Sequence, residues 1–183
     1  MNLVETTLPD VYVVEPEASE DERGFFARVF SADEFAEHGL VAAVAECSIA
    51  YNHVRSTLRG MHYQRPPHEE AKLVRCIQGA VYDVAVDLRP DSPAHLRWTA
   101  VELTAQNRRA LYVPPGCAHG YLTLEDGCEL LYQISERYEP ASAAGIRWDD
   151  PLVGIAWPAA PEVISARDGS YPALEPRDPA GDR

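Results

Sequence analysis

The stretch Lys72-Leu-Val-Arg-Cys-Ile-Gln-Gly-Ala-Val-Tyr-Asp-Val-Ala-Val-Asp-Leu-Arg89 carries the strongest structural signal in the chain. Its two halves are rich in apolar and β-branched residues, and they meet at the turn sequence Gln78-Gly79. In the second half, Val84, Val86 and Leu88 alternate with smaller or acidic residues, which is the period-two pattern of a strand. The stretch therefore predicts two strands joined as a hairpin, and Lys72 is the first residue of this hairpin.

Short apolar stretches separated by turn residues continue on both sides of this segment. Further strands are predicted at Val11–Val14, Trp98–Leu103, Leu111–Val113, Gly120–Leu124 and Cys128–Ile134. The third of these stops at Pro114-Pro115-Gly116, a turn signal. The last two flank Glu125-Asp126-Gly127, whose Asp-Gly step predicts a second hairpin.

Helix signals are few. Ser31 with Glu34 fits a capping box and Gly39 fits a helix stop, which predicts a short helix over Ala32–His38. A second short helix is expected after Pro151. Many short strands with few helices predict a mainly β fold, a β-sandwich or barrel, best described as an antiparallel double-sheet roll.

Composition limits the classes of protein that the chain can be. Its 183 residues, 46% hydrophobic and 25% charged, fit one globular domain over residues 1–183. Residues 172–183, rich in Pro, Asp and Arg, are expected to form a loose tail. The four cysteines include no close pair, which disfavours a zinc site built from cysteine pairs.

The net charge of −13 argues against nucleic acid and anionic membranes as partners, because both select for basic surfaces. A small anionic ligand remains compatible with it. No apolar run approaches the roughly 18 residues that span a bilayer. Met1–Glu15 lacks the basic start and apolar centre of a signal peptide. We therefore expect a cytoplasmic location.

Polar clusters interrupt the strand pattern at Asp21–Phe26, Leu58–Gln64, Lys72, Ala118–Tyr121, Tyr132 and Ser165–Asp168. Taken singly, each has an ordinary structural explanation. A strand tyrosine usually packs its ring, a lysine at a strand start is usually solvated, and an Arg-Asp pair near a terminus is often a surface ion pair. Only for His62 are the structural and the functional explanation equally good.

Taken together and in order, these segments resemble one known family. The matching motifs are Arg59–Gln64, Lys72–Arg75, Asp83–Arg89 with Ser92-Pro93, Pro114–Tyr121, Tyr132, Trp148–Pro151, Trp157-Pro158 and Ser165–Asp168. This order and spacing resemble the dTDP-4-dehydrorhamnose 3,5-epimerase family, over about Asp21 to Tyr171.

The resemblance implies a cupin-like jelly roll that is usually a homodimer and uses no metal or organic cofactor. By position, His62 matches the family's general base, Asp168 the carboxylate that orients it, Tyr132 the general acid and Lys72 the cation near the sugar keto oxygen. The positions that match substrate-binding residues are Arg23, Phe26, Arg59, Gln64, His119 and Arg167. The implied partner is a nucleotide sugar.

The chemistry of such a substrate requires these residue types. Hydrogens beside a ketone are acidic because the carbanion spreads onto the ketone oxygen as an enolate. His62, with an unperturbed pKa near ~6.5, is a competent base at neutral pH. A phenol with a pKa of ~10, such as Tyr132, can return a proton from the opposite face. Lys72 would stabilise the oxyanion, and Arg59 and Arg23 suit a diphosphate.

Three positions depart from the family pattern. Arg28 and a residue near Ala143 stand where the family carries glutamates, and Cys47–Tyr51 replaces a Q-x-N-x-S segment. All three fall in substrate-contact regions and none touches the proton-transfer set. This predicts intact chemistry with altered recognition, so a CDP- or GDP-linked sugar remains an alternative to a dTDP-linked one. Inversion at C3 or C5 alone also stays open, because the family includes enzymes that epimerise a single centre with the same acid-base set.

Two other functional classes stay open. A metal-dependent cupin needs clustered His and carboxylate ligands, whereas His62 is followed by Tyr63 and Gln64, without the H-x-H pair. A non-catalytic sugar-nucleotide binder would keep the arginines but would not need a proton donor facing a base. The presence of His62 and Tyr132 together argues against it.

Overall fold

The two strands predicted from the opening stretch, β7 (Lys72–Gln78) and β8 (Ala80–Asp87), lie in different sheets of the computed structural model, which describes residues 1–176. Gly79, with φ +77°, carries the chain from one sheet to the other. A Cβ at this position would lie 2.7 Å from the Cys128 sulfur, so only glycine fits. The strands are confirmed, but the predicted hairpin is wrong.

The same crossing occurs after β11 (Cys117–Thr123), which belongs to one sheet while β12 (Cys128–Ile134) belongs to the other. The second predicted hairpin is therefore also wrong. An Asp-Gly step supplies a positive-φ residue, here Gly127 at +66°, but it does not decide whether the chain reverses within a sheet or bridges two sheets.

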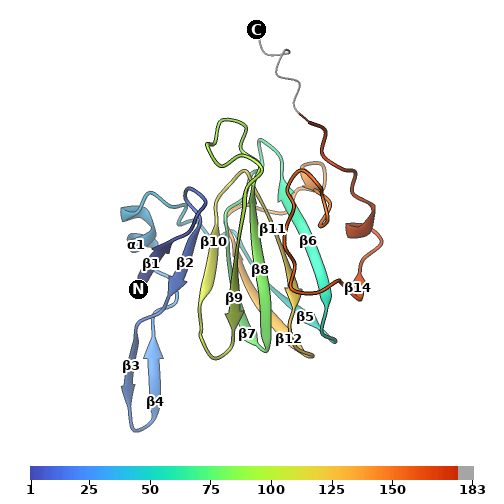
Figure 1. Cartoon of the computed structure of the whole chain (residues 1–183). Coiled ribbons are helices and arrows are strands. Elements are labelled where there is room, and N and C mark those ends of the chain that lie inside the picture. The colour runs from blue at the N-terminus through green and yellow to red at the C-terminus, as the bar shows by residue number, and fades with distance from the viewer. Residues whose placement is uncertain (177–183) are drawn as a thin grey trace.

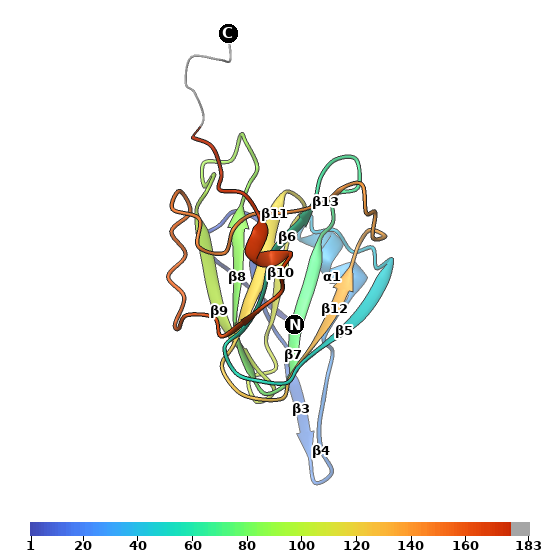
Figure 2. The ribbon, with the colours of Figure 1, turned by 90° about the vertical axis from the view of Figure 1, so that its right-hand side faces the viewer.

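Two facing sheets make up the body of the molecule (Figures 1 and 2). The first has the order β1-β2-β10-β7-β12-β5, all antiparallel, with β1 Asn2–Glu5, β2 Tyr12–Glu15, β10 Ala110–Val113 and β5 Glu46–Asn52. The second has the order β13-β6-β11-β8-β9, with β13 Ala143–Gly145, β6 Thr57–Gln64 and β9 Trp98–Thr104, while β14 (Val163–Ile164) pairs with β6 in parallel. This mainly β double-sheet roll confirms the predicted fold class.

The main core lies between the two sheets. It contains Val74 of β7, Leu111 of β10, Tyr121 of β11 and Leu130 of β12, none more than 1% exposed. A second apolar cluster lies on the outer side of the second sheet, the one that contains β8. There the C-terminal segment covers Val84 and other side chains. Residues on both faces of β8 are therefore buried, and its acidic side chains point between the sheets rather than to solvent.

The one α-helix described, α1 (Ala32–Glu37), begins at the predicted residue and ends one residue before the predicted end, with His38 as its C-cap. The Ser31 hydroxyl accepts a hydrogen bond from the Glu34 amide, and Gly39 follows at φ +70°. Phe35 anchors the helix over the first sheet against the ring of Tyr112, 5.6 Å away.

The helix expected after Pro151 does not form. The Asp150 carbonyl accepts from the amides of Val153 and Gly154, which makes a single turn. Gly154 then takes φ +64° and ends it. A short 3-10 helix, η1 (Asp168–Ser170), which the sequence pattern did not predict, follows instead.

Two peripheral segments complete the fold. β3 (Ala18–Asp21) and β4 (Gly24–Ala27) form a two-stranded hairpin that projects away from the two sheets (Figure 1). Of the predicted tail, Leu174 donates its amide to the Asp150 carboxylate at 2.7 Å, and residues 177–183 lie outside the described residues. Within residues 1–176, no helix is long and apolar enough to cross a bilayer.

Candidate active site

Two histidines lie opposite each other on neighbouring strands. His62 of β6 pairs directly with His119 of β11. The strands approach closely next to this pair, because a Cβ on Gly60 would lie 2.5 Å from the Cα of Gly120. The two glycines therefore set the spacing that places both imidazoles on one side of the sheet.

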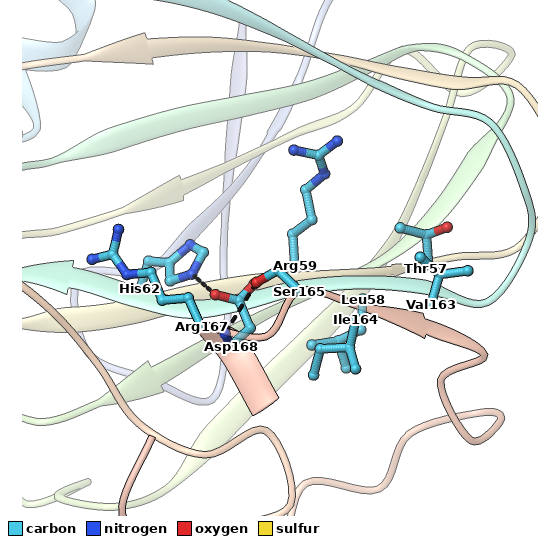
Figure 3. Close-up of a pocket in the computed structure, with 9 residues that line it drawn as sticks. All are labelled: Thr57, Leu58, Arg59, His62, Val163, Ile164, Ser165, Arg167 and Asp168. Atoms are coloured by element: carbon cyan, nitrogen blue, oxygen red, sulfur yellow. Dashed lines mark hydrogen bonds and ion pairs between the residues drawn. The ribbon is translucent and has the colours of Figure 1, made fainter. Parts of the chain in front are cut away.

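His62 is held by a carboxylate from the C-terminal segment (Figure 3). Its Nε2 lies 2.7 Å from Oδ1 of Asp168, and the other oxygen of Asp168 accepts the Gly60 amide at 3.2 Å. Burial opposes ionisation, but the hydrogen bond from His62 and the Gly60 amide outweigh it and lower the pKa of Asp168. An ionised carboxylate only accepts, so Nε2 carries the proton and Nδ1 is left free as a base.

His119 forms a second, deeper pair. Its Nε2 lies 2.9 Å from Oδ1 of Asp83, and the two residues are 4% and 0% exposed. Burial raises the pKa of Asp83, although His119 and Lys72 oppose the shift. The other oxygen of Asp83 has no hydrogen-bond partner in the described part of the chain.

Lys72 is the first residue of β7, and it borders the same space as the two histidines. Its ammonium donates to the backbone carbonyl of His62 at 3.1 Å and lies 2.7 Å from a carboxylate oxygen of Glu70. Both side chains are about nine-tenths buried. A hydrogen bond therefore joins Lys72 to β6, the strand that carries His62.

Tyr132 approaches from the facing sheet. It lies on β12, and its ring centroid is 5.9 Å from that of His119 in an edge-to-face arrangement. Burial, with Tyr121 and Asp83 nearby, raises the pKa of Tyr132 well above its usual value of 10.0. The phenol therefore keeps its proton at neutral pH.

Four of these side chains, those of His62, Lys72, His119 and Tyr132, line one cavity of about 270 Å³. Its lining residues are Ser48, Ile49, Ala50, Arg59, His62, Lys72, His119, Tyr132 and Ile134. Two adjoining pockets share His62 with it: one of about 390 Å³ contains Asp168 and Arg167 (Figure 3), and one of about 190 Å³ contains Glu70, Tyr138 and Ala143. The imidazole of His62, the phenol of Tyr132 and the ammonium of Lys72 therefore border the same cavity.

Comparison with known proteins identifies the family. The family model described as dTDP-4-dehydrorhamnose 3,5-epimerase matches residues 5–176. The chain belongs to this family. Among its relatives, the dTDP-4-dehydrorhamnose 3,5-epimerase of Salmonella typhimurium is 41% identical over 96% of both chains. The chain is accordingly an isomerase of the epimerase type.

Solved structures of family members agree with the fold. The dTDP-4-dehydrorhamnose 3,5-epimerase from Bacillus anthracis with TDP and PPi bound superposes with a TM-score of 0.90 at 35% identity, over 94% of this chain and 99% of that one. A 3'-monoepimerase from Streptomyces bikiniensis in complex with dTDP-quinovose gives 0.83 at 34% identity, over 92% and 85%. The double-sheet roll is thus the cupin-like jelly roll of the epimerase family.

Two arginines predicted from the resemblance border the epimerase pocket. Arg59 donates to the Asn52 side chain at 2.9 Å and to the Tyr51 carbonyl at 3.0 Å. Arg167 is exposed at the pocket that His62 and Tyr138 also line, and its interaction with the Tyr138 side chain contributes most to raising its pKa. Both guanidinium groups are accessible to an anion at the pocket mouth.

The other three predicted residues are not placed to bind a ligand in this chain alone. Gln64 lines the 190 Å³ pocket, but it is 3% exposed and its side-chain amide bonds only to backbone, namely the His68 and Arg137 carbonyls and the Glu139 amide. Arg23 and Phe26 lie on the projecting β3–β4 hairpin, where the Phe26 residue is 80% exposed and Arg23 pairs with Asp21. The described chain does not bring this hairpin to its own pocket.

The departures from the epimerase pattern fall partly in the pockets. Ala143 of β13 and the β5 residues Ser48 to Ala50 line them, as the resemblance implies. Arg28 instead pairs with Glu34 at 3.4 Å, at the base of the hairpin.

Sequence reasoning missed two carboxylates of the site, Asp83 and Glu70. An acidic residue inside an apolar strand is a usable signal for the first, because buried carboxylates need a partner. The spacing of two residues from Lys72 is a signal for the second, since i and i+2 share a face of an extended chain. Among the described residues, no three His, Cys, Asp or Glu side chains are grouped so as to hold a metal ion.

Proposed function

We propose that this epimerase inverts C3, C5 or both of a dTDP-linked 4-keto-6-deoxyhexose by removing a proton next to the ketone and returning one to the opposite face. The substrate class is that of its relatives, whose names specify dTDP-4-dehydrorhamnose. The observation that carries the proposal is the His62–Asp168 pair beside a cavity that Lys72 and Tyr132 also line.

The proposed base and acid come from opposite sheets. His62 lies on β6 of one sheet and Tyr132 on β12 of the other, and both border the same cavity. Inversion at a carbon requires this arrangement, because a proton removed from one face must be replaced from the other. With Nε2 bound to Asp168, Nδ1 of His62 takes the substrate proton, and the Tyr132 phenol donates its own.

The enolate oxygen would face the cations of the site. We assign its stabilisation to Lys72, with His119, which Asp83 holds in place, beside it in the cavity wall. Preorganised donors of this kind usually contribute the largest electrostatic share of catalysis. Arg59 and Arg167, exposed at the pocket mouth, suit the diphosphate, because planar guanidinium groups bind such oxygens in pairs. We give Gln64 a structural role, since backbone groups occupy its amide.

We further propose that the epimerase is a homodimer in which one copy completes the site of the other. β5 is one of the two edge strands of its sheet, and it exposes Ile49 (61%), which lines the cavity, and Tyr51 (47%). An exposed apolar edge strand is normally covered. The hairpin that carries Arg23 and exposed Phe26 can supply that cover from a second copy, which would bring both residues to a pocket.

The substrate assignment is tested by incubating the protein with dTDP-4-keto-6-deoxyglucose and following the sugar signals by proton NMR. We expect new signals of an inverted hexose. Parallel incubations with CDP- and GDP-linked 4-ketosugars test the altered lining at Ala143 and Ser48. Faster turnover of either would replace dTDP as the preferred carrier, and turnover of none would overturn the proposal.

A further inference from the structure

The cation of the site is unique in the sequence. Lys72 is the only lysine among the 183 residues, and every other strongly basic side chain is an arginine. An ammonium is a compact charge with three N–H donors on a flexible stem, whereas a guanidinium is a rigid fork. A lysine can direct a single donor at one oxygen, provided that something fixes its flexible stem.

The structure shows what holds this side chain. The Lys72 ammonium contacts the carbonyl oxygen of His62 at 3.1 Å and the Glu70 carboxylate at 2.7 Å. No third acceptor among the described residues takes the remaining donor. Since Lys72 lines the cavity with His119 and Tyr132, that donor is available on the cavity side.

The Glu70–Lys72 pair differs from an ordinary surface ion pair. The side chains are 10% and 9% exposed, so water screens the charges poorly. Removing one partner of such a pair leaves the other charge buried and uncompensated. Glu70 also borders the pocket that contains His62 and Tyr138, so the pair belongs to the wall of the site.

We propose that Glu70 is a positioning residue for the reaction: with the His62 carbonyl it fixes the Lys72 ammonium so that its free N–H meets the ketone oxygen. The inference rests on the proposed function, because it names the group that aims the oxyanion donor. Glu70 acts only through Lys72, while His62 and Tyr132 carry the protons. Because the His62 carbonyl is the other anchor, the donor stays in register with the base.

The kinetic test is a double-mutant cycle. Exchange of the C3 and C5 protons with D₂O is measured for wild type, Glu70→Gln, Lys72→Met and the double variant. Glu69→Gln, an exposed glutamate one residue away, is the matched control. A misplacement of ~1 Å can cost about 100-fold in rate, so we expect Glu70→Gln to lower kcat by about tenfold or more with little change in KM.

The outcomes separate the two proposals. In the Lys72→Met background Glu70→Gln should add nothing, while Glu69→Gln stays at the wild-type rate. An unchanged kcat in Glu70→Gln, or an equal loss with and without Lys72, overturns the positioning role. If the wild type exchanges no proton, the proposed function fails instead. Should Glu70→Gln not fold, Glu70→Asp, which keeps the charge but shortens the reach, takes its place in the cycle.

A second measurement needs no substrate. Protein labelled with lysine carrying ¹³Cε and ¹⁵Nζ gives the signal of one lysine side chain, that of Lys72. We expect this signal to move in Glu70→Gln and to stay in place in Glu69→Gln. Coincident lysine signals in all three proteins would show that Glu70 does not hold the ammonium and would overturn the inference.

Discussion

Replacing Asp168 by asparagine tests the His62–Asp168 pair with almost no change in shape. The carboxylate accepts twice, from His62 at 2.7 Å and from the Gly60 amide at 3.2 Å. An asparagine has one acceptor oxygen and one NH₂ group. With its oxygen toward His62, its NH₂ faces the Gly60 N–H. With its NH₂ toward His62, Nε2 must accept, so the ring proton moves to Nδ1 and blocks the base.

The expected loss of kcat in Asp168→Asn follows from the contribution of the general base. The first orientation brings two donors together, and the second removes the general base, whose contribution is about 10²–10⁴-fold. At 1.36 kcal/mol for each tenfold, the activation barrier rises by about 3–5 kcal/mol. We therefore expect Asp168→Asn to lower kcat for proton exchange about 10²–10⁴-fold, while the arginines still bind the diphosphate.

The assay is deuterium incorporation from D₂O into dTDP-4-keto-6-deoxyglucose, followed by NMR. Asp150→Asn is the matched control, because Asp150 is 1% exposed and its carboxylate accepts from the amides of Leu152 and Leu174, which line none of the pockets described. Thermal unfolding of each variant checks that it is folded. If the Asp168→Asn enzyme is folded and exchanges protons within about threefold of the wild-type rate, far less than the expected loss, the carboxylate does not hold His62 in the tautomer that acts as a base.

Three further predictions follow from the site. Tyr132→Phe should lower formation of inverted product about 10²–10⁴-fold while His62 still exchanges substrate protons, so NMR should show deuterated but uninverted substrate; equal loss of both would contradict this division. Mixing inactive Arg23→Ala with inactive His62→Ala should restore activity if the hairpin works on the partner's site, and no recovery after subunit exchange would contradict it. Because the pKa of Asp168 is lowered, its contribution to stability is present above its usual value of 3.8 and lost as pH falls through the folded-state value. The Tm values of wild type and Asp168→Asn should therefore converge as the pH falls below 3.8, and a gap that widens on acidification would contradict this.

The strand content of the fold could be predicted from the sequence, but the path between sheets could not. Period two in β8 shows which side chains share a face, yet it does not show what covers each face. Val84 is covered by the C-terminal segment, whereas Asp83 points between the sheets and pairs with His119. Likewise, Gly79 supplies a positive φ for a turn, and only packing of the whole chain decides that the turn bridges two sheets.

Part of the site could likewise be predicted, and part of it depends on how the whole chain packs. His62 and Asp168 are 106 residues apart, and only the resemblance, not local pattern, predicted that they act together. The resemblance also named Gln64, Arg23 and Phe26, but it could not show that backbone groups occupy Gln64 in this chain. Nor could it show that the hairpin points away from its own pocket, because both depend on how distant parts of the chain pack.

Every other role proposed for the site depends on one step, the removal of a proton beside the ketone by His62. The most direct measurement is proton NMR of dTDP-4-keto-6-deoxyglucose in D₂O with the wild-type protein, beside His62→Ala. We predict loss of the C3 signal, the C5 signal or both with wild type, which also counts the inverted centres, and persistence of both signals with His62→Ala. Equal exchange by the two proteins would contradict the claim.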